Sequence, residues 1–151
     1  MGIPERWRRF RELPVDIEHR LADLTPLFER DNVRLVYLFG SLTQDRPAHD
    51  VDLAILTQGE PAYRLYQAIA DCLGTERLDL VDLRRAPPVL RFQIVRAGRP
   101  IYVADEREHE QFVLDTLHLY RDTAPLRRQQ RELLRKRIAK WSSIVKQSSN
   151  G

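Results

Sequence analysis

The sequence predicts an α/β fold (α+β in looser usage) in which helices pack around a small mixed sheet of three or four strands. Three short apolar runs bounded by turn residues are typical of buried strands: residues 33–39, 51–56 and 78–83. Amphipathic helical patterns precede, separate and follow these runs, as they do in α/β domains. A hydrophobic fraction of 42% and a charged fraction of 31% fit a single globular domain of 151 residues.

Apolar residues at helical spacing predict the helices. Four of them, from Ile17 to Phe28, recur at intervals of four, three and four and so form one stripe of a helix. Pro26 either kinks this helix or restarts it, with Thr25 as the cap. We expect further helices over residues 62–73, 87–98 and 106–121, and a short edge strand over residues 100–103.

Charge divides the chain into three parts. Residues 1–14 are basic and aromatic and predict an N-terminal arm, followed by one domain over residues 15–124. Between Arg127 and Lys146, eight basic residues stand against one acidic residue, a net charge of +7; since the whole chain carries +3, the remainder carries −4. Residues 125–151 predict a basic amphipathic helix and tail whose apolar stripe packs on the same domain.

The basic C-terminal helix has three interpretations at this point. It binds nucleic acid through phosphates, contacts an acidic partner, or presents a charged face to water. The absence of interleaved aromatic residues argues against direct nucleic-acid binding. Its apolar stripe, which includes Leu134, Ile138 and Trp141, also fits an interface in a homo- or hetero-oligomer.

Composition argues against several classes of protein. No apolar stretch approaches the roughly 20 residues of a membrane span, so we expect no membrane contact. The first residues, with Trp7 and Arg8, lack the apolar core of a signal peptide. Cys72 is the only cysteine, which excludes an internal disulfide and a cysteine-based zinc site. We therefore expect a cytoplasmic protein.

The candidate functional site begins where the first predicted strand ends, at Gly40 and Ser41. Glycine lets the backbone turn sharply and approach a ligand closely. If a helix starts there, its free N–H groups form an anion site to which Ser41 adds a hydroxyl. After a spacer of eight residues, Asp50 and Asp52 open the second strand. Residues two apart in a strand share a face, about 7 Å apart along the backbone.

Two carboxylates on one strand face repel each other unless a cation lies between them. The face of Asp50 and Asp52 continues into the core through Ala54 and Leu56, so crowding there raises the pKa of at least one carboxyl. A pair of divalent ions bound to triphosphate oxygens would compensate these charges. A phosphate cradle beside paired carboxylates therefore predicts nucleotidyl or phosphoryl transfer.

The third predicted strand offers two more carboxylates. Asp79 and Asp82 lie three positions apart, so a strand places them on opposite faces. Asp79 heads an apolar face, as the first pair does, and we expect it to join the site. Asp82 lies at the strand end, where a solvated or capping carboxylate is the ordinary outcome. His49 adjoins Asp50, and we expect it to point to the opposite side of the strand.

These motifs resemble a known superfamily. Gly40-Ser41, the spacer and Asp50-Val51-Asp52 resemble the motif of the DNA polymerase β-type nucleotidyltransferases, in their minimal (MNT) branch. The whole pattern is similar to the MntA-like adenylyltransferase antitoxins that partner HEPN toxins. It covers roughly residues 33–120, with further matching segments at residues 78–83, 86–92 and 98–102.

The resemblance implies a palm-like nucleotidyltransferase core and AMP transfer from ATP to a hydroxyl, in this branch a tyrosine of the cognate HEPN toxin. It implies two Mg²⁺ ions held by Asp50 and Asp52, with Asp79 as third ligand and base. It also implies that the Gly40 backbone and the Ser41 hydroxyl hold the β- and γ-phosphates.

Two alternatives remain open from the sequence. An enzyme of this type could instead adenylylate a small hydroxylated molecule such as an aminoglycoside. The spacer between Ser41 and Asp50 is shorter than is usual in the family, which also fits an inactive antitoxin that neutralises its toxin by contact.

Overall fold

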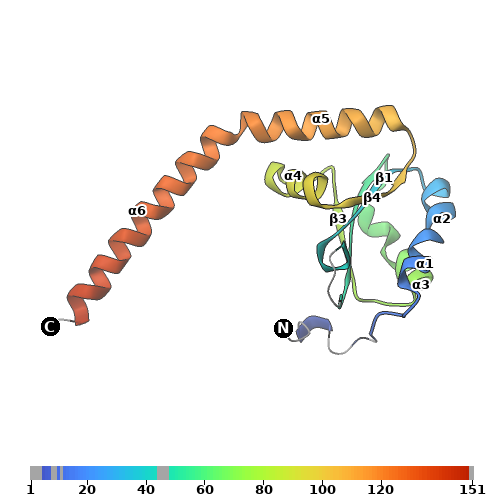
Figure 1. The fold of residues 1–151 in the computed structure, drawn as a ribbon, viewed down its shortest axis with the longest axis horizontal. Coiled ribbons are helices and arrows are strands. Elements are labelled where there is room, and N and C mark those ends of the chain that lie inside the picture. The colour runs from blue at the N-terminus through green and yellow to red at the C-terminus, as the bar shows by residue number, and fades with distance from the viewer. Residues whose placement is uncertain (1–4, 8–9, 11, 44–47, 150–151) are drawn as a thin grey trace.

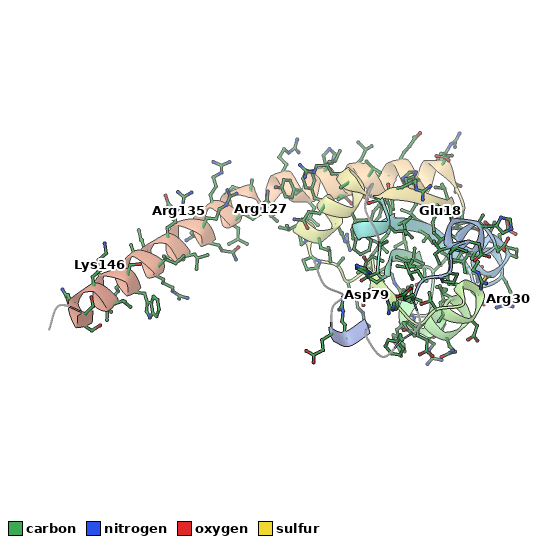
Figure 2. The ribbon with its side chains drawn as sticks, turned by 60° about the horizontal axis from the view of Figure 1, so that its bottom comes forward. Glu18, Arg30, Asp79, Arg127, Arg135 and Lys146 are labelled. Atoms are coloured by element: carbon green, nitrogen blue, oxygen red, sulfur yellow. The ribbon has the colours of Figure 1, made fainter. Side chains whose placement is uncertain are left out.

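A mixed four-stranded sheet with strand order β3-β2-β1-β4 forms the centre of the protein (Figure 1). The computed structural model describes residues 5–7, 10, 12–43 and 48–149. Strand β1 (Val33–Phe39) pairs antiparallel with β2 (Val51–Thr57) and with β4 (Arg99–Val103). Strand β3 (Leu78–Asp82) pairs parallel with β2. The C-terminal helix α6 (Ala124–Ser149) extends away from this body (Figures 1 and 2). The predicted mixed α/β fold is confirmed.

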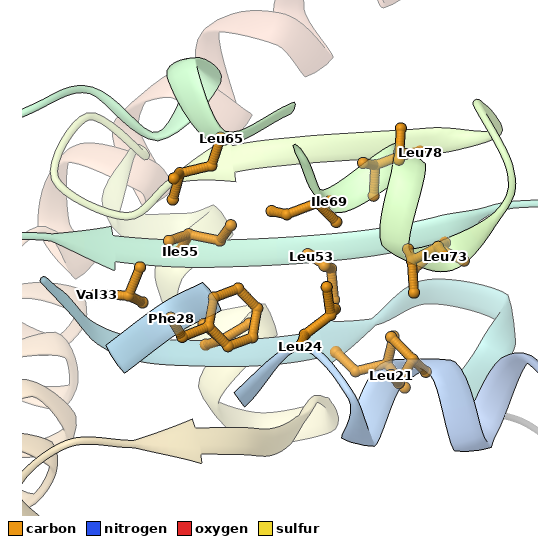
Figure 3. Close-up of a cluster of buried hydrophobic side chains, with 14 of the residues drawn as sticks. Leu21, Leu24, Phe28, Val33, Leu53, Ile55, Leu65, Ile69, Leu73 and Leu78 are labelled. Atoms are coloured by element: carbon orange, nitrogen blue, oxygen red, sulfur yellow. The ribbon is translucent and has the colours of Figure 1, made fainter. Parts of the chain in front are cut away.

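Helices α1 (Ile17–Ala22), α2 (Thr25–Arg30) and α3 (Tyr66–Leu73) cover one face of the sheet. A short 3-10 helix, η3 (Ala62–Leu65), leads into α3. The predicted stripe is buried here, and Pro26 restarts the helix, although Leu24 rather than Thr25 occupies the cap position. The core of this face includes Leu21, Leu24, Phe28, Val33, Leu53, Ile55, Leu65, Ile69, Leu73 and Leu78 (Figure 3).

Helices α4 (Pro88–Ala97) and α5 (Glu106–Asp122) cover the opposite face. Because successive strand residues point to opposite sides, Leu35 and Tyr37 of β1 and Ala54 of β2 face these helices. They pack with Leu83 and Ile94 in a second, smaller core. This is also the face on which Asp52 and Asp79 lie, since each is an even number of positions from a residue of this core.

Helix α6 differs from the expectation. None of its residues is buried, and its apolar residues, among them Leu134, Ile138 and Trp141, are exposed rather than packed on the domain. Since α1–α3 cover one face of the sheet and α4 and α5 the other, neither face is left for α6. The Arg127 guanidinium lies 3.6 Å from the centre of the Tyr120 ring, which stacks on Phe92 at 3.8 Å. These two contacts hold the start of α6 against α4 and α5.

Two sequence predictions fall partly outside the described residues. The basic arm appears as a single 3-10 turn, η1 (Glu5–Trp7), and residues 1–4, 8–9 and 11 are not described. The spacer before Asp50 is described except for residues 44–47, which include Pro47. Across the described residues, no helix combines the length and the apolar character that a membrane span requires.

Candidate functional site

The candidate site lies at the edge of the sheet where β1 ends and β2 and β3 begin. Strands β2 and β3 are parallel, so both start at the same edge, and antiparallel β1 ends there. The register sets Asp52 opposite Asp79 on one side and opposite Phe39 on the other. Asp79 lies close to the short N-terminal turn η1 (Figure 2).

Three carboxylates meet at this edge. Asp50, Asp52 and Asp79 each place a carboxylate oxygen within 4.8 Å of the others, and all three side chains are half-buried. Burial, together with the neighbouring charges of Asp50 and Asp79, raises the pKa of Asp52 to about 7. Oxygen donors grouped in this way match the preference of hard divalent cations.

Gly40 makes room for this cluster. It adopts a left-handed conformation with φ +77° where β1 passes into the 3-10 turn η2 (Gly40–Thr43). A Cβ atom at this position would overlap Oδ2 of Asp52. The Thr43 hydroxyl closes the turn by donating to the Gly40 carbonyl at 2.7 Å. The Ser41 backbone belongs to the same turn, while its side chain lies outside the described part of the structure.

The substitution Gly40→Ala is expected to reduce catalytic activity more than it reduces the stability of the fold. Alanine at positive φ costs about 1–2 kcal/mol of stability, and its Cβ must also displace the Asp52 carboxylate. A displacement of about 1 Å costs on the order of 10²-fold in catalytic rate. Steady-state assays and thermal unfolding would measure the two effects separately.

Gly59→Ala is the matched control for this prediction. Gly59 also has a positive φ, +99°, but a Cβ there meets nothing within 4 Å. The control should lose similar stability and retain its activity. Equal activity losses in the two variants would mean that the close approach of Gly40 to Asp52 has no functional role.

A cationic side chain contacts two of the three carboxylates. Nη2 of Arg6 donates to Oδ2 of Asp79 at 2.8 Å and lies 3.8 Å from Oδ2 of Asp50. The sequence predicted a basic arm, but it did not predict the contact between Arg6 and Asp79, which lie 73 positions apart. The only local sign was the arginine-rich composition of residues 1–14.

Asp82 and His49 do not join the cluster. Asp82, the last residue of β3, accepts the Arg84 backbone N–H at 3.0 Å in the turn that follows, so it caps a turn and not a helix. Among the described residues, the three aspartates form the only group of three or more acidic, histidine or cysteine side chains close enough to share an ion, and His49 is not one of them. The His49 carbonyl instead accepts from Nη1 of Arg77 at 3.4 Å.

A pocket opens beside Gly40, between the end of β1 and helix α4. Its volume is about 370 Å³, within the range of small-molecule sites. Its lining is mainly apolar and includes Phe39, Gly40, Thr43, Leu90, Gln93 and Ile94. The carboxylate cluster and this pocket therefore share Gly40 as a common wall.

Comparison with known proteins identifies the family. Residues 22–107 match the family described as polymerase beta, nucleotidyltransferase. The chain belongs to this nucleotidyltransferase family. It is 34% identical over 100 residues to protein adenylyltransferase MntA of Shewanella oneidensis, an alignment that covers 60% of this chain and 70% of that protein. The predicted membership of the MNT branch and the predicted enzyme class are confirmed.

Solved structures of similar fold support the assignment of this chain to the nucleotidyltransferase family. One similar structure is an MNT antitoxin in complex with a tri-AMPylated HEPN toxin of Shewanella oneidensis. It matches with a TM-score of 0.63 and 26% identity over 78% of this chain and 98% of that chain. Another is a toxin-antitoxin with AMP-PNP, with a TM-score of 0.63 and 27% identity over 76% and 97% of the two chains.

Proposed function

We propose that this nucleotidyltransferase is an antitoxin that transfers AMP from ATP to a tyrosine hydroxyl of a cognate HEPN toxin. The observation that carries the proposal is the cluster of three carboxylates, with the Gly40 backbone packed closely against Asp52. Similar proteins support it, because one is named a protein adenylyltransferase and another is bound to a tri-AMPylated HEPN toxin. The AMP-PNP complex supports ATP as the nucleotide.

The three carboxylates fit a magnesium site. Their oxygens lie within 4.8 Å of one another, and their mutual repulsion is what a bound cation would relieve. Asp52 in β2 and Asp50 directly before it would hold two ions, with Asp79 completing the set. Bound Mg²⁺ would supply charge neutralisation for the triphosphate and for the reacting phosphoryl group.

One related structure carries substitutions at a pair of aspartates. It is a MntA toxin-antitoxin mutant in which two aspartates two positions apart are replaced by glutamates. The spacing equals that of Asp50 and Asp52. This relative matches with a TM-score of 0.64 and 26% identity over 76% of this chain and 97% of that chain.

The chain's own residues would position the reactants. N–H groups of the turn at Gly40, with the Ser41 hydroxyl, would hold the β- and γ-phosphates, and the adjoining pocket would receive the nucleoside. The acceptor oxygen attacks the α-phosphorus, the bond from that phosphorus to the bridging oxygen breaks, and pyrophosphate leaves. Asp79 takes the proton of the attacking hydroxyl. Such an in-line displacement depends mainly on positioning and charge neutralisation.

Mass spectrometry of the partner tests the proposal. The chain is incubated with ATP, Mg²⁺ and a candidate cognate HEPN protein, and the intact mass of that protein is measured. We expect the mass to rise by one or more adenylyl groups, with the modification on tyrosine and abolished by EDTA. An unmodified but neutralised toxin would favour the binding antitoxin, and adenylylation only of a small molecule would favour the second enzyme class.

A further inference from the structure

We propose that Arg6 is the resident cation of the carboxylate cluster, and that the N-terminal turn must leave the cluster before metal and nucleotide bind. The inference rests on the metal role proposed above for the three aspartates. It adds a competing group from the protein itself, supplied by a segment distant in sequence.

The contact occupies the oxygens that a metal would need. The Arg6 guanidinium lies 2.8 Å from Oδ2 of Asp79 and 3.8 Å from Oδ2 of Asp50. A Mg²⁺ ion binds carboxylate oxygens at about 2.0–2.1 Å. An ion on the same Asp79 oxygen would therefore meet the positive guanidinium at close range. The two cations compete for one site.

A buried arginine ties the arm to the cluster. Arg77 is only 3% exposed, and its Nη2 donates to the Phe10 carbonyl of the arm at 2.9 Å. Its Nη1 reaches the His49 carbonyl, next to Asp50, at 3.4 Å, and its own carbonyl accepts the Val51 N–H at 2.8 Å. One side chain thus joins the arm to the start of β2. The fold holds Arg6 near the cluster at a high effective concentration.

The contact is also weak enough to be released. The Arg6 side chain remains 61% exposed, and exposed ion pairs contribute little because water screens them. A divalent ion carries twice the charge of Arg6. The presence of Arg6 therefore weakens the attraction between the ion and the carboxylate cluster only in part. We expect removal of Arg6 to tighten metal binding by about two- to tenfold.

Calorimetric titration of the full-length chain with Mn²⁺ tests the competition. The variants are Arg6→Gln and the matched control Arg99→Gln. Arg99 is also an exposed arginine in an ion pair, 3.1 Å from Glu18, so its replacement changes the net charge equally without touching the cluster. We expect Arg6→Gln alone to bind Mn²⁺ more tightly, and its melting temperature to rise more on addition of Mn²⁺ than that of the wild type.

Two results would overturn the inference. One is an unchanged or weaker Mn²⁺ affinity in Arg6→Gln; the other is an equal gain in Arg99→Gln, which would reduce the effect to net charge. Asp52→Asn separates this failure from that of the proposed function. If Asp52→Asn loses Mn²⁺ binding while Arg6→Gln matches the wild type, only the competition is wrong. If Asp52→Asn binds Mn²⁺ normally, the metal site itself is wrong.

Discussion

Asp52→Asn is expected to abolish AMP transfer while the sheet stays folded. Asp52 is the central carboxylate, set opposite Asp79 in the sheet and two positions from Asp50, which lies directly before β2. Asparagine keeps the shape but removes the charge that the metal requires, so metal affinity and turnover should fall together. Titration with Mn²⁺ and an assay of AMP transfer measure the two losses. Wild-type turnover in this variant would exclude Asp52 from the site.

The same substitution should stabilise the metal-free protein at neutral and alkaline pH. The pKa of Asp52 is raised from 3.8 to about 7, mainly by burial and then by Asp50 and Asp79. A raised carboxyl pKa makes the wild type lose stability as the pH rises from about 4 through 7, because the charged form is disfavoured in the fold. Asp52→Asn lacks this loss. After discounting for solvent screening of a partly exposed group, the gain is about 1–2 kcal/mol above pH 7.

Thermal unfolding in EDTA at several pH values tests the stability prediction. The melting temperatures of the wild type and Asp52→Asn should agree near pH 4 and separate progressively up to about pH 8. A constant difference across this range would show that the substitution acts through packing and not through the charge of Asp52.

Asp79→Asn is expected to damage chemistry more than binding. Asp79 comes from β3, whereas Asp52 lies in β2 and Asp50 directly before it, so we expect these two to contribute most of the proposed metal binding. A catalytic base contributes about 10²–10⁴-fold to the rate, so turnover should fall by that order. Binding of ATP with Mg²⁺ should weaken by less than about tenfold, the pattern of an interaction made mainly in the transition state. Losing the contact between Asp79 and Arg6 also removes part of the competing interaction.

Asp82→Asn is the control for this strand. Asp82 lies beyond the cluster and accepts the Arg84 backbone N–H, so its replacement should leave turnover close to that of the wild type. Turnover should be measured at saturating ATP and Mg²⁺, with nucleotide affinity determined separately by calorimetry. A crippled Asp82→Asn with an active Asp79→Asn would contradict the assignment of the third carboxylate to Asp79.

Local periodicity made much of the fold predictable. Strand β1 runs over the residues predicted for it, and the apolar stripe from Ile17 to Phe28 is buried as expected. The alternation of strand side chains also predicted that Asp50 and Asp52 share a face. These features depend on neighbours two to four positions apart, so the sequence carries them directly. The strand pattern and the family resemblance together favoured Asp79 as the third carboxylate.

Local periodicity could not predict the long-range contacts. No spacing indicated that Arg6 would reach Asp79, or that the buried Arg77 would bond the arm and the start of β2 together. A basic residue in a terminal arm has no periodic partner, and its position depends on which surface carries unbalanced negative charge. That surface exists only once the strands have paired.

The sequence by itself determined the elements, their inward faces and the residue types of the site, because these follow from local spacing and backbone preference. The tertiary structure alone decided how the elements meet. Parallel pairing of β2 and β3 set Asp79 opposite Asp52, and the resulting crowding, with burial, raised the pKa of Asp52. Occupation of both sheet faces by other helices left α6 exposed, against the expectation from its apolar stripe. Such outcomes depend on which surfaces remain free after folding, and local spacing does not encode them.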